Sequence, residues 1–225
     1  MISRAQEPFH FFSRLTLTHM AGIKAKNLQE LLEHLKTVPE SVIYQHTHRF
    51  LQEHQYLVPE PPNDFGYWVT NMLLDEELGE RLMAIDIMRY HSLNDLRQAI
   101  VSVIENHLWK RNNLQQVPEG KEFHFMSAMR FSMPTQYQAY DLAEFLRCLQ
   151  KVSISSLYLH IFEARMRTPL GVNDFASWFE TQLGEKVLAK NIGDLDPYMQ
   201  TLEGLRAKII LLIQNRLEEF SHVAS

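Results

Sequence analysis

The chain has 225 residues, of which 45% are hydrophobic and 22% charged, with a formal net charge of −5 and a pI near 6.1. These values predict a soluble globular protein with one large domain or two small ones. The acidic balance excludes the basic face typical of a nucleic-acid binder, so we expect no nucleic-acid partner. The start of the chain lacks an apolar signal segment, and no aliphatic run approaches the ~20 residues of a membrane span. We therefore expect a cytoplasmic protein with no membrane partner.

The sequence repeats itself at an offset of 114 positions. Residues 9–46 align without a gap on residues 123–160, and 13 of the 38 pairs are identical. Average residue usage would give about 2 identities by chance. With short deletions, the likeness extends over residues 9–108 and 123–217. We therefore predict two diverged copies of one unit.

Each copy begins with an alternating segment. Phe9, Phe11 and Ser13 alternate with other residues, and residues 123–131 repeat the pattern. A period of two predicts a short strand. Because isolated strands are marginal in water, the first segments of the two copies could pair as a small ribbon.

Helix signals follow in both copies. Asn27-x-x-Glu30 and Asp141-x-x-Glu144 have the form of a capping box and precede apolar residues at helical spacing. We expect a second helix over residues 41–55 and 155–167, and a third that begins at the Asn63-Asp64 and Asn173-Asp174 caps. A short fourth helix should lie around residues 78–87 and 183–192. The last helix should begin at Ser92 in the first copy and at the Asp196-Pro197 pair in the second.

These elements predict a mainly α fold of two tandem, pseudo-twofold-related copies of a roughly five-helix unit. The first segment of each copy could add a short β ribbon. We assign residues 1–108 to the first repeat unit, 109–121 to a linker and 122–225 to the second repeat unit. The two units could also pack as one globule.

One Tyr-x-His pair in each copy is the main candidate for chemistry. Tyr44-x-His46 and Tyr158-x-His160 place a histidine on an apolar helix face. Such a histidine is either a hydrogen-bonded core residue or a polar group that lines a pocket. His10 and His124 could join these pairs across the pseudo-twofold axis and complete a ligand-binding site.

Other catalytic signals are missing. We find no metal-ligand spacing of histidines or cysteines, no nucleophile elbow and no glycine-rich phosphate loop, so we predict no catalytic residue and no metal ligand. The single cysteine, Cys148, cannot form an intrachain disulfide, and we interpret it as an inert, partly buried residue. The sequence does not indicate a cofactor.

Several of these motifs together resemble a bacterial family that is catalogued only as a domain of unknown function. They are Phe9-His10-Phe11, Ser41-x-x-Tyr44-x-His46-x-x-Arg49-Phe50, Pro61-Pro62-Asn63-Asp64-Phe65-x-x-Trp68 and Leu195-Asp196-Pro197-Tyr198. The resemblance covers nearly the whole chain. It implies a soluble bacterial or archaeal protein, and it implies no activity.

Two hypotheses for the function follow. The first is a non-catalytic interaction or regulatory protein that binds another protein or a second copy of itself. Met126, Met129, Met133, Tyr137 and Tyr140 would supply an adaptable surface. The second is a small-ligand or metal-binding protein with its site at the interface of the two repeats. An enzyme is the least favoured class.

Overall fold

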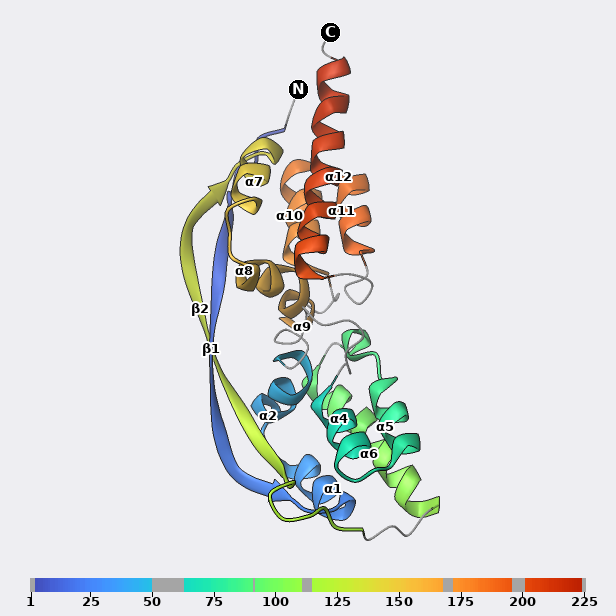
Figure 1. Cartoon of the computed structure of the whole chain (residues 1–225). Helices are drawn as coiled ribbons and strands as arrows, with labels where there is room; N and C mark the ends of the chain where they lie inside the picture. Colours follow the sequence, from blue (N-terminus) through green and yellow to red (C-terminus); the bar gives the residue numbers. More distant parts are fainter. Residues whose placement is uncertain are drawn as a thin grey trace. The chain divides into compact units, whose positions relative to one another are not determined.

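The computed structural model describes residues 3–49, 63–90, 92–110, 115–167, 172–195 and 201–223. In this part of the chain the fold is mainly helical, with one antiparallel two-stranded sheet (Figure 1). None of the described helices is long and apolar enough to cross a membrane. The elements in chain order are β1 (Phe9–Ala25), α1 (Leu28–Thr37), α2 (Glu40–Tyr44), the π-helix η1 (Gln45–Arg49), α4 (Asp64–Asn71), α5 (Glu76–Met83), the 3₁₀-helix η2 (Ile87–Arg89), α6 (Leu93–Lys110), β2 (Phe123–Ala139), α7 (Leu142–Leu149), α8 (Ile154–Tyr158), the π-helix η3 (Leu159–Glu163), α9 (Ala164–Arg167), α10 (Asp174–Leu183), α11 (Lys186–Gly193) and α12 (Leu202–Val223).

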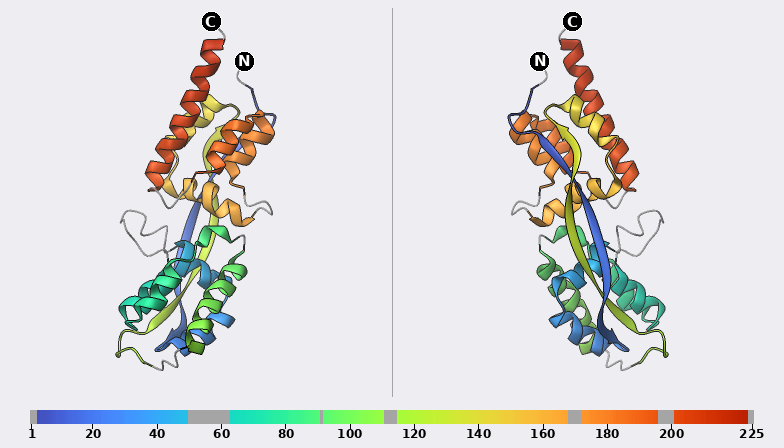
Figure 2. Two further views of the ribbon diagram at one scale, coloured as in Figure 1. Left: turned by 90° about the vertical axis from the view of Figure 1, so that its right-hand side faces the viewer. Right: turned by 90° about the vertical axis from the view of Figure 1, so that its left-hand side faces the viewer.

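The two strands form a long ribbon. β1 and β2 each have 17 residues and run side by side in opposite directions (Figures 1 and 2). A ribbon was expected, but the expectation of short strands is wrong, because β1 continues to Ala25. Gly22 has a φ of 74°, a conformation that residues with a Cβ rarely adopt, so glycine lets the strand continue through this point.

The chain forms two compact units that do not follow the order of the sequence. Unit 1 contains residues 1–15 and 131–225, and unit 2 contains residues 16–130. Each unit therefore holds one end of β1 and one end of β2. The boundaries differ from the expected segments 1–108 and 122–225.

The predicted fold class is corrected by this division. Two tandem five-helix copies would each be a continuous stretch, whereas unit 1 is assembled from both ends of the chain. The physical reason is the ribbon. An antiparallel pair places the start of β1 beside the end of β2, so Phe9 and Phe11 lie beside helices that follow β2. The described residues do not form a repeat of five helices per copy.

In unit 2 the long helix α6 packs against α1, α2 and α5, and α4 packs against α5. The last pair crosses closely, because a Cβ on Gly79 would overlap the side chain of Thr70. Leucines at helical spacing bury one face of α1. The capping box before α1 is confirmed, since Asn27 accepts from the Glu30 N–H and the Glu30 carboxylate accepts from the Lys26 N–H.

In unit 1 the long helix α12 packs against α7, α8 and α11, and α10 packs against α11. Asp141 caps α7 by accepting from the Glu144 N–H, as predicted. The N-cap of α10 is Asn173, which accepts from the Ala176 N–H. The predicted cap at Asp196 and Pro197 lies outside the described residues, as does the predicted helical stretch over residues 50–55.

Candidate functional sites

His46 is buried in unit 2 and is hydrogen bonded through both ring nitrogens. Its Nδ1 lies 2.6 Å from a carboxylate oxygen of Asp64, the first residue of α4. Its Nε2 lies 2.8 Å from the backbone nitrogen of Met126 in β2. Because a backbone N–H can only donate, Nε2 is the acceptor and Nδ1 carries the proton that is donated to Asp64. The ring thus links η1 to α4 and β2.

His160 has the same environment in unit 1. Its Nδ1 lies 2.7 Å from a carboxylate oxygen of Asp174, and its Nε2 accepts from the N–H of Phe12 at 2.9 Å. The strand that binds each histidine comes from the other half of the sequence. The sequence pattern predicts Asp64 and Asp174 as part of the helix caps, but their carboxylates bind the histidines while the preceding asparagines cap the helices.

Aromatic rings enclose both imidazoles. The ring centre of His160 lies 4.9 Å from that of Phe9 and 5.6 Å from that of Phe175. The ring centre of His46 lies 4.6 Å from that of Phe123. A ligand or metal at either histidine would have to displace an existing hydrogen bond and enter this apolar packing, and that would cost free energy.

The two tyrosines of the Tyr-x-His pairs are also buried. Tyr44 stacks on His48 at 5.8 Å between ring centres, and Tyr158 stacks on Phe162 at 5.0 Å. The guanidinium of Arg130 lies 4.1 Å above the ring of Tyr44, within the range of a cation–π interaction.

The six residues predicted to line a ligand site are divided between the units. Unit 2 holds Tyr44, His46 and His124, whereas unit 1 holds His10, Tyr158 and His160. His10 and His124 are exposed on their strands, next to buried phenylalanines. Among the described residues, no group of three or more His, Cys, Asp or Glu side chains could hold a metal ion. The predicted site at the repeat interface stays a prediction.

The two π-helices share a backbone form but differ in chemistry. η1 buries the polar residues Gln45, Thr47 and His48, whereas η3 buries apolar residues at the same places in the alignment. Burial and the nearby Arg130 guanidinium lower the pKa of His48 to about 4, so its imidazole is neutral near pH 7. Because η3 folds without these polar groups, the π-helical backbone itself does not require them.

Unit 1 has a buried ion pair that unit 2 lacks at the aligned positions. The guanidinium of Arg14 in β1 binds the carboxylate of Glu163 in η3, with Nε at 2.8 Å, and also donates to Ser132. Glu163 is only 1% exposed. Arg49 and Ala128 align with Glu163 and Arg14 in the repeat. This pair links the strand to the helix beside His160.

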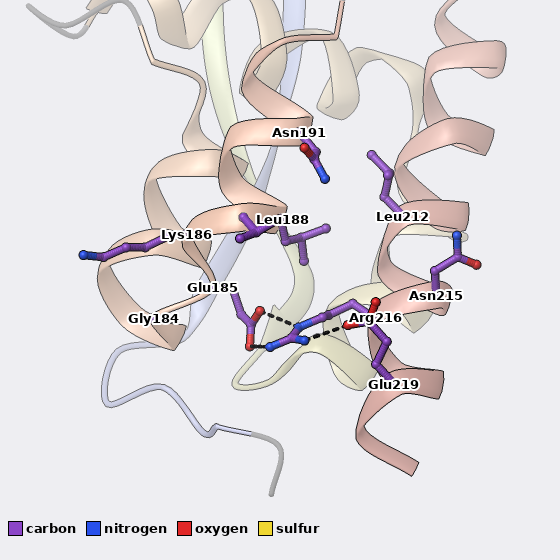
Figure 3. Close-up of a pocket in the computed structure, with 10 residues that line it drawn as sticks. Gly184, Glu185, Lys186, Leu188, Asn191, Leu212, Asn215, Arg216 and Glu219 are labelled. Carbon is purple, nitrogen blue, oxygen red and sulfur yellow. Dashed lines mark hydrogen bonds and ion pairs between the residues drawn. The ribbon is translucent and has the colours of Figure 1, made fainter. Parts of the chain in front are cut away.

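A cleft of about 510 Å³ lies between α11 and α12 in unit 1 (Figure 3). Arg216 extends from α12 to Glu185, the N-cap residue of α11, at 2.7 Å, and also binds Glu219 at 2.7 Å. Hydrogen bonds to Glu185 and then to Glu219 raise the pKa of Arg216. Since two carboxylates already neutralise this cation, the cleft offers little attraction to an anion.

A similar link is present in unit 2. His107 of α6 lies 2.8 Å from Asp75, which is the N-cap residue of α5 and accepts from the Leu78 N–H. In both units, therefore, the carboxylate of the N-cap residue joins a short helix to the last long helix, although only Asp75 also caps its helix with a side-chain hydrogen bond. We interpret the Glu185–Arg216 pair as part of this packing.

Cys148 is half-buried, as predicted. Its Sγ donates to the carbonyl of Gln138 at 3.3 Å, and burial raises the pKa of the thiol above its usual value. A raised pKa lowers the thiolate fraction at neutral pH, which fits an inert side chain.

The ribbon carries the main exposed apolar surface. Within the described part of the chain, seven of the twelve exposed large hydrophobic side chains lie on β1 and β2. We call them the exposed ribbon residues: Phe12, Leu15, Leu17, Met20, Met129, Phe131 and Met133. Met129 and Met133 of this set were predicted to form an adaptable surface, together with Met126, Tyr137 and Tyr140, which are half-buried. The other exposed ribbon residues were missed because alternation does not reveal where along a strand the covering helices end.

Taken together, the described elements define a mainly helical protein built around a two-stranded ribbon. The chain matches the family described as "Family of unknown function (DUF5752)" over residues 6–214, and it belongs to this family. It is also similar to a solved structure described as "The structure of OrfY from Thermoproteus tenax", with 26% sequence identity and a TM-score of 0.80. That likeness covers 95% of this chain and 97% of the other. None of the curated proteins compared with the chain matches it.

Proposed function

We propose that this chain is a non-catalytic interaction protein that binds protein through the exposed ribbon residues. The observation that carries the proposal is the concentration of exposed Leu, Met and Phe side chains on β1 and β2. A two-sided antiparallel sheet usually alternates an apolar covered face with a polar solvated face. Here large apolar side chains stay exposed along the middle of both strands, most of them on the face that carries the buried phenylalanines at the strand ends, and exposed apolar residues of this kind mark interaction sites.

The histidine sites support a non-catalytic role in a second way. Both ring nitrogens of His46 and of His160 are used to hold a strand and an aspartate. A general base needs a free lone pair within reach of a substrate proton. We therefore assign the two histidines to the attachment of the ribbon rather than to catalysis.

A photo-crosslinking amino acid at position 131 tests the proposal in cells that make the protein. We expect covalent adducts from position 131 and none from a matched position at Trp109, which is exposed but lies on α6. Equal adduct yields at both positions, or none at position 131, would count against the ribbon as the binding surface.

A small-ligand protein is the second candidate, and η1 favours it. Burying Gln45, Thr47 and His48 costs solvation free energy that the aligned apolar residues of η3 do not cost. Gln45 accepts from Thr18, and Thr47 donates to the Ile43 carbonyl, so a polar ligand beside η1 would add hydrogen bonds to a set of polar groups that the protein already holds in place. Replacing the three residues by Leu, Ile and Phe should then keep the fold but abolish thermal stabilisation by a panel of sugars, carboxylates and phosphate.

We further infer that residues 9–46 and 123–160 are related by internal duplication and that the protein is cytoplasmic. The 13 identities in 38 pairs support the duplication, and so does the repeated arrangement of histidine, aspartate and strand N–H. The single cysteine supports a reducing compartment. Fractionation of the cells that produce the protein tests the location.

A further inference from the structure

We propose that a second cleft of unit 1, beside α7, binds the phosphate group of a small phosphate monoester. The cleft has a volume of about 390 Å³ and is lined by residues from the start of the chain, the end of β2 and α7, all of them within unit 1. We call it the α7 cleft. It shares no residue with the exposed ribbon residues, so the proposal goes beyond the proposed function.

Positive charge predominates in the α7 cleft, because its lining includes three cations and one carboxylate. Arg4 is already neutralised, since Asp141 and Glu144 lie 3.4 Å and 3.6 Å from its guanidinium. Arg147 and Lys151 are exposed, and neither makes a hydrogen bond or an ion pair with any residue that the structure describes. These two cations are therefore available to an anion from solution.

The two unpaired cations act on the same side chain of the cleft. Burial raises the pKa of the Cys148 thiol, and the Arg147 and Lys151 cations act on it in the opposite direction. Both charges are thus close enough to this thiol to share one ligand beside it. The cleft between α11 and α12 differs, because two carboxylates there neutralise Arg216.

The repeat shows that the helix does not need these cations in order to fold. The alignment of residues 123–160 on 9–46 places Arg147 on Glu33 and Lys151 on Thr37. Helix α1 nevertheless has the same kind of side-chain cap and the same buried face as α7. A role in binding accounts for cations that one unit has and the other folds without.

The charges and the size of the cleft favour a phosphate monoester. A guanidinium binds phosphate oxygens through two parallel hydrogen bonds, and an ammonium binds them as a point charge. A phosphate monoester carries about −1.5 to −2 charges at neutral pH, which suits two cations better than a single carboxylate does. Tyr137 and Tyr140 also line the cleft, and their hydroxyls make no hydrogen bond to the described residues. The volume lies in the range of small-molecule sites.

Alkylation of Cys148 by iodoacetamide tests the proposal on the full chain. Cys148 is the single cysteine, so the reaction reports on the α7 cleft. We expect phenyl phosphate to slow the alkylation with a dissociation constant in the millimolar range, as is reasonable for exposed cations and a small ligand. Benzoate has the same ring and one charge and should protect more weakly, and phenol should not protect.

Variants that copy unit 2 locate the site. Arg147→Glu combined with Lys151→Thr should raise the dissociation constant of phenyl phosphate about 20-fold or more, because both ion pairs are lost. Lys151→Thr alone should raise it about fivefold. The matched control is Lys208→Gln, an exposed lysine on α12 outside the cleft, which should leave binding unchanged. Phosphorus NMR of phenyl phosphate measures binding without using the thiol, and thermal unfolding shows that each variant folds.

Four results would overturn the proposal. Phenyl phosphate that leaves the alkylation rate unchanged rejects the site, and binding that survives both Lys151→Thr and the double variant rejects its location. Protection by benzoate as strong as that by phenyl phosphate rejects the phosphate group. A phosphotyrosine peptide that binds much more tightly than phenyl phosphate rejects a small molecule as the source and assigns the cleft to a phosphorylated protein. None of these results bears on the exposed ribbon residues, so the proposed function is tested separately.

Discussion

The buried His48 makes unit 2 sensitive to acid, and the sensitivity can be calculated. Its pKa is lowered from 6.5 to about 4, first by burial and then by Arg130. The unfolded chain therefore binds a proton as pH falls through 6.5, while the folded chain binds it only near pH 4. Folding stability from the neutral imidazole is complete above pH 6.5 and is lost between pH 6.5 and 4. At about 1.4 kcal/mol per pH unit, the loss is about 3 kcal/mol.

His48→Phe removes the imidazole that titrates but keeps an aromatic ring stacked on Tyr44. The variant copies unit 1, where Phe162 stacks on Tyr158 at the aligned position. We expect wild type and variant to differ little near pH 7.5. The variant should be more stable by about 3 kcal/mol relative to the wild type once the pH reaches 4, because other groups titrate alike in both proteins and cancel.

Urea unfolding followed by fluorine NMR of fluorotryptophan provides the assay. Trp68 reports on unit 2, and Trp178 reports on unit 1. The free energy of unfolding measured at Trp68 should show the pH-dependent difference between the two proteins, whereas that measured at Trp178 should not. Parallel pH curves for wild type and His48→Phe at Trp68 would refute the reasoning.

Three further predictions concern the contacts that hold the ribbon and helices. His46→Ala or His160→Ala leaves a strand N–H and an aspartate without their partner, so either variant should lose about 3 kcal/mol of folding free energy. Thermal unfolding measures this loss, and an unchanged melting temperature would contradict the assignment. Glu163→Gln should lower the free energy of unfolding in urea by ~3 kcal/mol, because it leaves the buried Arg14 guanidinium without a carboxylate. An unchanged free energy of unfolding would contradict this. Arg216→Met should lower the free energy of unfolding by about 1 kcal/mol or less, since Arg216 is partly exposed. It should also increase hydrogen exchange in α11. A larger loss of stability would indicate a greater role for the link to Glu185.

Local features of the fold could be predicted from the sequence because they depend on neighbouring residues. The capping boxes at Asn27 and Asp141 form as expected, since cap and partner are three residues apart. The helix starts at Asn63 and Asn173 and the long helix after Ser92 were found in the same way. The apolar spacing also indicated correctly that His46 and His160 lie on buried faces.

The pairing of distant segments could not be predicted. The strands that begin at Phe9 and Phe123 share the Phe-His-Phe-x-Ser start and the same alternation, so either could pack against either set of helices with the same hydrophobic pattern. The sequence does not distinguish these alternatives. The predicted tandem copies place each strand with the helices that follow it in the chain. The N–H donors to the histidines come from the strand of the other half, Met126 and Phe12. For the same reason, the exposed ribbon residues could not be identified.

Hydrogen–deuterium exchange measured in buffer and in a lysate of the cells that make the protein tests the central claim most directly. If a protein binds the exposed ribbon residues, the amides of residues 12–20 and 129–133 should be more protected in the lysate than in buffer. The amides of α11, where Val187 is exposed, should not change. Ribbon protection that is the same in buffer and in the lysate would contradict the account.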